Sequence, residues 1–176
     1  MNPTLVLDLL RHGEAAPATQ GGDAARPLTA AGRDALVLLG ARLASAGVRY
    51  QRALTSPLVR AGESAAIVLG ALREPPALEI LEELAPEASP THTLEALRRA
   101  RLVNGHALLV GHQPLLGQLA LLLSGAEARF APGSLVRVEC PRGLAAGAGR
   151  IALALHPREG GARAPEAGGD AGGGSW

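Results

Sequence analysis

An arginine and a histidine stand at the end of an apolar run near the start of the chain. In LDLLRHGEAAP, residues 7–17, Arg11 and His12 follow the run and Gly13 comes directly after them. A guanidinium donates parallel hydrogen bonds to an oxyanion such as phosphate, and a neutral imidazole can attack phosphorus and carry the phosphoryl group. Because glycine lacks a Cβ, Gly13 lets the backbone approach a ligand closely. This stretch therefore predicts phosphate binding joined to nucleophilic chemistry.

Two other segments carry side chains of the same kinds. TSPLVRAGES, residues 55–64, contains Arg60, and LVGHQPLL, residues 109–116, contains His112. Arg60 falls in the opening turns of an expected helix, where the helix dipole disfavours a cation by roughly 0.3 to 1 kcal/mol unless an anion is bound there. Phosphate is the simplest anion that reconciles Arg60 with the other cationic side chains.

The chain contains five histidines, and their positions separate them. His12 and His112 follow expected strands, whereas the others lie at helix boundaries or beside the C-terminal segment: His92, His106 and His156. The flanking Arg11 and Gly13 favour His12 as the nucleophile. We then expect His112 to stabilise charge on the phosphoryl oxygens.

The hydrophobic pattern alternates between strand and helix along the chain. Short apolar runs bounded by turns predict strands at residues 4–10, 49–56, 78–81, 106–112, 134–140 and 150–156. Apolar residues at helical spacing predict helices at residues 30–46, 57–72, 91–102 and 114–124. This alternation predicts an α/β domain with a mostly parallel sheet and helices on both faces. Ligands bind such sheets beyond the carboxyl ends of the strands, where the candidate residues are expected.

Composition limits the other classes of function. The 176 residues suit one domain, expected over residues 1–156, and a disordered glycine- and alanine-rich tail at 157–176. A net charge of +1 without a basic run argues against nucleic acid and membrane partners. The single Cys140 excludes an internal disulfide. With no run long enough to cross a membrane and no signal peptide, we expect a cytoplasmic protein.

Five motifs, in this order and spacing, resemble those of the histidine phosphatase superfamily. They are LLRHGEA at 9–15, RPLT at 26–29, TSPLVRAGES at 55–64, ELAP at 83–86 and LVGHQPLL at 109–116. The resemblance spans about residues 4–155 and points to the small SixA branch of protein phosphohistidine phosphatases. It implies a three-layer αβα sandwich like that of the phosphoglycerate mutases.

The resemblance also implies roles for individual residues. His12 would be the nucleophile, and the phosphate pocket would be completed by Arg11, Arg60 and His112. No metal or other cofactor would be needed. The short loops between the motifs imply an open pocket that accepts a protein side chain. The expected substrate is therefore phosphohistidine on a signalling protein, such as a histidine-phosphotransfer domain. A small-molecule phosphomonoesterase, acting on a phosphorylated metabolite, and a non-catalytic phosphate-binding module stay open as alternatives.

Other residues of the motifs also have expected roles. Family members related to the phosphoglycerate mutases carry a glutamate proton donor, which Glu83 matches, with the neighbouring Glu82 as the alternative. Arg26 is expected to fix the loop ahead of Thr29, an expected helix N-cap, or to line the substrate pocket. Ser56 is expected to cap the helix that follows it.

Overall fold

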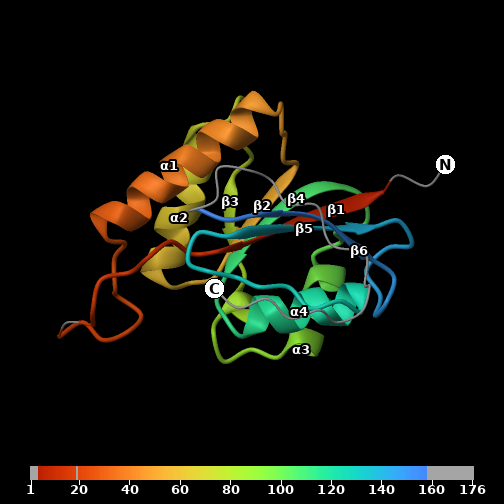
Figure 1. The fold of residues 1–176 in the computed structure, drawn as a ribbon. Helices are drawn as coiled ribbons and strands as arrows, with labels where there is room; N and C mark the ends of the chain where they lie inside the picture. The colour runs from red at the N-terminus through yellow and green to blue at the C-terminus, as the bar shows by residue number, and fades with distance from the viewer. Residues whose placement is uncertain (1–3, 19, 158–176) are drawn as a thin grey trace, which may run out of the picture.

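A six-stranded sheet lies at the centre of the computed structural model, which describes residues 4–18 and 20–157 (Figure 1). The strands are β1 (Leu5–Arg11), β2 (Arg52–Thr55), β3 (Leu78–Ile80), β4 (Gly105–Gly111), β5 (Leu135–Cys140) and β6 (Arg150–Leu155). Their order in the sheet is β3-β2-β4-β1-β5-β6. The pairs β2–β3, β2–β4 and β1–β4 are parallel, whereas β5 pairs antiparallel with β1 and with β6. The expected α/β fold with a mostly parallel sheet is confirmed.

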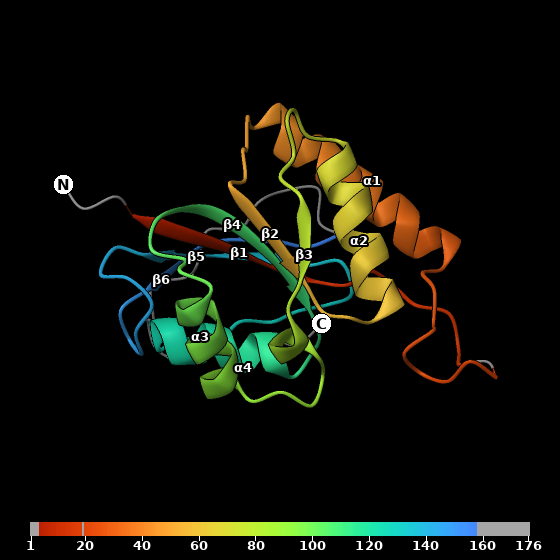
Figure 2. The ribbon, with the colours of Figure 1, turned by 180° about the vertical axis from the view of Figure 1, so that it is seen from behind.

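Helices cover both faces of the sheet, as Figure 2 shows from behind. They are α1 (Ala30–Ser45), α2 (Val59–Gly70), α3 (Pro90–Arg99) and α4 (Leu115–Ser124), with a short 3-10 helix, η1 (Glu82–Leu84). α1 and α2 pack on one face of the sheet, and α3 and α4 pack on the other. The three-layer αβα arrangement is therefore as expected.

Leucine side chains fill the core on both sides of β1. Leu7 and Leu9 pack with residues of α3 and α4, whereas Leu10 packs with residues of α1 and α2. All three side chains are fully buried. Burying one leucine side chain stabilises the fold by about 1.5 to 3 kcal/mol, so packing on both faces holds this strand in place. The packing of β1 therefore also sets the position of the residues that follow its carboxyl end.

The helix starts agree with the sequence signals, with one exception. Thr29 is the N-cap of α1, and its hydroxyl accepts a hydrogen bond from the Gly32 N–H. The second helix begins at Val59, and its N-cap is Leu58, which makes no side-chain capping bond. The N-cap role expected for Ser56 is therefore wrong, because the helix begins later than Pro57 suggests.

Asp8, for which the sequence offered no role, is fully buried in β1 among ionic and polar partners. Its carboxylate accepts two hydrogen bonds from Arg137, at 2.7 and 2.8 Å, and one from the Tyr50 hydroxyl at 2.7 Å. The His106 Nε2 atom lies 3.0 Å from the same carboxylate. Burial acts to raise the pKa of Asp8, but Arg137 and His106 outweigh it and hold this pKa below its ordinary value.

No helix within the described ranges is long and apolar enough to cross a membrane. Apart from Pro157, the tail expected at residues 157–176 lies outside the described residues. The domain limit at residue 156 and the disorder of the tail stay predictions.

We predict that Asp8→Asn lowers the free energy of unfolding at pH 7 by about 3 kcal/mol, because it leaves the Arg137 guanidinium without a carboxylate. The pKa of Asp8 is lower in the folded chain than its ordinary value of 3.8. Its ionised form therefore stabilises the fold above that value, and the stabilisation is lost as the pH falls below it. Urea denaturation at several pH values measures both effects.

Tyr50→Phe is the control, because it removes one hydrogen bond and leaves the ion pair, at a cost of about 1 kcal/mol. A difference between wild type and Asp8→Asn that stays constant from neutral pH to below the ordinary aspartate pKa would contradict the assignment.

Candidate active site

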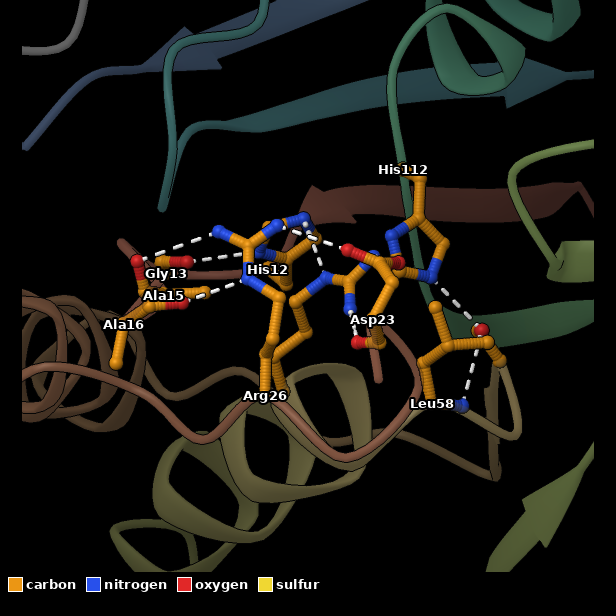
Figure 3. Close-up of polar contacts among 10 residues, drawn as sticks. His12, Gly13, Ala15, Ala16, Asp23, Arg26, Leu58 and His112 are labelled. Atoms are coloured by element: carbon orange, nitrogen blue, oxygen red, sulfur yellow. Dashed lines mark hydrogen bonds and ion pairs between the residues drawn. The ribbon is translucent and has the colours of Figure 1, made fainter. Parts of the chain in front are cut away.

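The register of β1 and β4 brings two histidines together. Arg11 pairs with Gly111 at the carboxyl ends of these parallel strands, and the His12 N–H donates to the Gly111 carbonyl at 3.1 Å. His112 follows immediately, and the centroids of the two imidazole rings are 4.9 Å apart. Figure 3 shows both rings in the same small region of the molecule.

The hydrogen bonds of His12 define its tautomer. Its Nδ1 atom lies 2.7 Å from the Gly13 carbonyl, which can only accept, so Nδ1 carries the proton. Its Nε2 atom accepts from the Arg60 Nε–H at 3.4 Å, so Nε2 carries the lone pair. Burial is the largest cause that lowers the pKa of His12 to about 4; the Gly13 bond opposes it, and nearby arginines, Arg60 first, lower it further. His12 is therefore a neutral imidazole at neutral pH.

The loop after β1 fits tightly between α1 and α2. A Cβ on Gly13 would lie 2.8 Å from a Leu36 methyl carbon and 3.0 Å from the Gly32 carbonyl, so a larger residue would push α1 away. The Gly13 N–H donates to the Ser64 hydroxyl at 3.0 Å, and that hydroxyl donates to the Arg60 carbonyl at 2.6 Å. Ser64 thus ties the loop that follows His12 to the helix that carries Arg60.

His112 is nearly fully buried and bound to Ser56. Its Nε2 atom lies 2.8 Å from the Ser56 hydroxyl oxygen, which accepts from the Leu58 N–H at 3.3 Å. This arrangement favours the tautomer in which Ser56 donates to Nε2 and the Nδ1 atom carries the proton. Burial is the main cause that lowers the pKa of His112 to about 3, followed by the charges of neighbouring side chains. The ring is neutral, and its Nδ1–H has no partner among the described residues.

Arg11 is the second group with a buried polar atom that lacks a partner. Its Nη1 donates to the Phe130 carbonyl at 2.8 Å, whereas its Nε has no hydrogen-bond partner among the described residues. Unpaired buried donors are costly, and an oxyanion bound here would satisfy them.

Arg26 and Asp23 are also part of the cluster. Arg26 donates from Nε to the Ala16 carbonyl at 2.6 Å and from Nη1 to Asp23 at 2.9 Å, so it fixes the loop as expected. Arg60, whose side chain is 5% exposed, donates from Nη2 to the same Asp23 carboxylate at 2.9 Å. The cluster therefore combines the neutral His12 imidazole, the guanidinium groups of Arg11, Arg26 and Arg60, and the solvent-exposed Asp23 carboxylate. Figure 3 shows His12, Arg26 and Asp23 in this arrangement.

Comparison with known proteins agrees with this geometry. The model of the histidine phosphatase superfamily (branch 1) matches residues 7–88. Phosphohistidine phosphatase SixA of Escherichia coli K12 is 34% identical over 121 residues, which are 68% of this chain and 74% of that protein. The chain belongs to the histidine phosphatase superfamily. Its relatives place it in the SixA-type branch, and membership supports a phosphatase activity.

Solved structures extend the likeness to the whole fold. The protein histidine phosphatase SixA complexed with tungstate has a TM-score of 0.78 and 28% identity, over 86% of this chain and 97% of that one. Phosphoglycerate mutase from Bacillus anthracis, at 17% identity and a TM-score of 0.61 over 81% of this chain and 91% of that one, shares the fold.

The glutamates suggested by the family make no polar contact with the cluster. Glu83 is in η1, which lies against the end of β4, and its carboxylate accepts from Arg99 of α3 at 2.6 Å. No hydrogen bond or ion pair joins Glu83 or its neighbour Glu82 to His12 or His112 in the described part of the chain. The proton-donor role of Glu83 stays a prediction. No group of three or more His, Cys, Asp or Glu side chains suited to a metal is found among the described residues.

Sequence reasoning missed three of the site's residues. Ser56 and Ser64 stand within the TSPLVRAGES motif, and the spacing of Ser64 from Arg60 is the signal that could have identified its backbone bond. Asp23 stands three residues before Arg26 in a loop of small residues, where an acid beside an expected arginine is the only hint.

We predict that the folded protein keeps His12 in the Nδ1–H tautomer with a pKa of about 4. Arg60→Gln raises this pKa because it removes a nearby positive charge, but leaves it below the ordinary value because burial persists. Nuclear magnetic resonance of ¹⁵N-labelled imidazoles against pH measures both the tautomer and the pKa. The same titration in urea is the control, and a His12 pKa at or above 6.5 in the folded chain contradicts the assignment.

Proposed function

We propose that the chain removes phosphate from phosphohistidine on a protein, through a covalent phospho-His12 intermediate. The observation that carries this proposal is the contact between a neutral, lone-pair-bearing His12 Nε2 and the Arg60 guanidinium at 3.4 Å. A nucleophile aimed at permanent positive charge is suited to an electrophile that is itself a dianion.

In the first step, His12 Nε2 attacks phosphorus in line with the bond to the leaving group. A new P–N bond forms as the old P–N bond breaks. The leaving ring takes the electron pair and departs as neutral imidazole, because its other nitrogen already carries a proton taken from solvent. Arg11, Arg60 and the His112 Nδ1–H neutralise the equatorial oxygens. The Nδ1–H bond to the Gly13 carbonyl, at 2.7 Å, stabilises the positive charge that the His12 ring gains on phosphorylation.

In the second step, water attacks phosphorus from the side that the leaving group vacated. The P–N bond to His12 breaks, inorganic phosphate forms, and the neutral imidazole returns with its proton still on Nδ1. These steps use only the side chains of the cluster, so we propose that the enzyme works without a metal or other cofactor.

The position of Glu83 bears on the choice of substrate. Its carboxylate is paired with Arg99 at 2.6 Å, away from the described contacts of His12. Breaking a P–N bond to imidazole makes a small demand on a general acid, whereas an alkyl ester leaves as an alkoxide and needs one. Glu83 would have to leave Arg99 before it could protonate an alkoxide, so this pairing favours a phosphoramidate substrate over a phosphate monoester.

Two further observations support a protein substrate. The related Escherichia coli protein is a phosphohistidine phosphatase, and a related SixA structure was solved with tungstate, an oxyanion. A hollow of about 850 Å³ lies next to the loop that follows β1, and its lining includes Glu14, Leu38 of α1 and Pro132. We propose that this hollow receives the surface around the phosphorylated side chain, such as part of a histidine-phosphotransfer domain, while the phosphoryl group enters the cluster beside it.

We predict that His12→Ala abolishes turnover and that the wild-type chain, quenched during turnover of a ³²P-labelled phosphohistidine protein, carries acid-labile ³²P. The label is absent from His12→Ala because the only nucleophile is gone. His92→Ala is the matched control, since His92 is exposed on α3. Substantial turnover by His12→Ala, or turnover that a metal chelator abolishes, would refute the mechanism.

We predict that Glu83→Gln leaves hydrolysis of protein phosphohistidine nearly unchanged and slows hydrolysis of a phosphate monoester by about 10²-fold, if any monoester turnover is measured. Steady-state kinetics on a phosphorylated histidine-phosphotransfer domain and on a panel of phosphometabolites supply the comparison, with Glu82→Gln as the matched variant. Equal losses on both substrates would remove the distinction. A higher kcat/KM on a metabolite than on the phosphoprotein would favour the phosphomonoesterase alternative.

A further inference from the structure

Asp23 places a carboxylate among the cationic side chains of the pocket. It accepts from Arg60 Nη2 and from Arg26 Nη1, each at 2.9 Å, and its main-chain carbonyl accepts from Arg60 Nη1 at 2.7 Å. The Asp23 side chain is 59% exposed, whereas the Arg60 side chain is 5% exposed. The carboxylate therefore reaches a buried guanidinium from the solvent side.

The Asp23 carboxylate is ionised at neutral pH. Its hydrogen bonds from Arg26 and then from Arg60 hold the pKa of Asp23 below its ordinary value. The three N–H donors that the carboxylate and its main-chain carbonyl engage belong to Arg60 and Arg26, whose charges both act on His12. Asp23 is thus a resident anion of the pocket.

A phosphoryl group needs some of the same donors. Its phosphorus must lie in line with His12 Nε2, which is itself 3.4 Å from Arg60 Nε, so its oxygens come within reach of the Arg60 guanidinium. An N–H donates at full strength to one acceptor, and two anions placed side by side repel each other. The carboxylate and the phosphoryl oxygens therefore compete for Arg60.

We propose that Asp23 is a specificity-determining residue whose carboxylate competes with phosphate for Arg60 and Arg26. Entry of a phosphoryl group displaces this carboxylate toward solvent. The backbone beside it stays attached, because the Ala24 carbonyl accepts from the Val59 N–H of α2 at 3.1 Å. The displacement offsets part of the attraction between phosphate and the arginines and lowers the affinity of the pocket for phosphate.

This competition distinguishes the substrate from the product, a step that rests on the proposed function. Inorganic phosphate makes contacts only within the pocket, so nothing offsets the loss of affinity that competition with Asp23 causes. A phosphoprotein makes additional contacts outside the pocket, and their binding energy offsets the displacement of Asp23. Asp23 therefore favours release of inorganic phosphate over its retention.

The test measures binding of inorganic phosphate to the whole chain by titration calorimetry at fixed ionic strength. Asp23→Asn keeps the size of the side chain and removes its charge, and we expect it to tighten phosphate binding about tenfold. Glu95→Gln is the matched control, because Glu95 is exposed on α3 and has no hydrogen bond or ion pair with a described residue. We expect it to change phosphate affinity less than about twofold.

Unchanged or weaker phosphate binding by Asp23→Asn would overturn the proposal and make Asp23 a residue that only holds Arg60 in place. Tighter binding supports the competition, because loss of a purely structural contact does not increase affinity. Arg60→Gln, made in the wild-type and Asp23→Asn chains, separates this failure from that of the proposed function. If phosphate binds and Arg60→Gln weakens that binding, the phosphate pocket is supported whatever the effect of Asp23→Asn. If neither the wild-type chain nor any variant binds phosphate, the assignment of the phosphate pocket is wrong.

Discussion

The contact between the neutral His12 imidazole and the Arg60 guanidinium is the interaction on which the site depends. Burial and the neighbouring positive charges disfavour the imidazolium form, so Nε2 keeps its lone pair, which accepts a hydrogen bond from Arg60 Nε–H at 3.4 Å. The same positive charges attract a phosphoryl dianion. One arrangement therefore keeps His12 neutral and, under the proposed mechanism, attracts the phosphoryl group to it.

The cluster around this contact forms where three elements meet, at the carboxyl ends of the central strands β1 and β4. β1 delivers Arg11 and His12, β4 delivers His112, and α2 delivers Arg60. Leucines packed on both faces hold β1, and the Ser64 hydroxyl joins the loop after β1 to α2 through bonds of 3.0 and 2.6 Å. The lack of a side chain on Gly13 allows that loop to approach α1. Core packing thus holds the side chains of the site in the positions on which its chemistry depends.

The charged residues of β1 have two different roles. Asp8, in the middle of the strand, is fully matched by Arg137, Tyr50 and the nearby His106, which suits a role in stability. At the end of the strand, Arg11 keeps a buried Nε without a partner in the described structure, which suits a role in binding. The Asp8 carboxylate is thus satisfied within the fold, whereas Arg11 keeps a donor that a bound oxyanion would satisfy.

The sequence by itself determined the order of strands and helices, the α/β class and the main candidates Arg11, His12, Arg60 and His112. These follow from periodicity and short motifs, which are local properties of the chain. Helix limits shifted by a few residues, as at Val59, because proline and serine signals near a helix start do not say which residue enters the first turn. The tail lies outside the described residues.

Only the tertiary structure decided which partner each polar side chain takes. Asp23 on Arg60, Ser56 on His112, Glu83 on Arg99 and Asp8 on Arg137 join residues that are 37, 56, 16 and 129 positions apart. The sequence specifies that these groups exist, but strand order, register and helix packing specify which of them meet. Hydrogen bonds act only over a few ångströms, so a pairing exists only after the fold has brought both groups within that range.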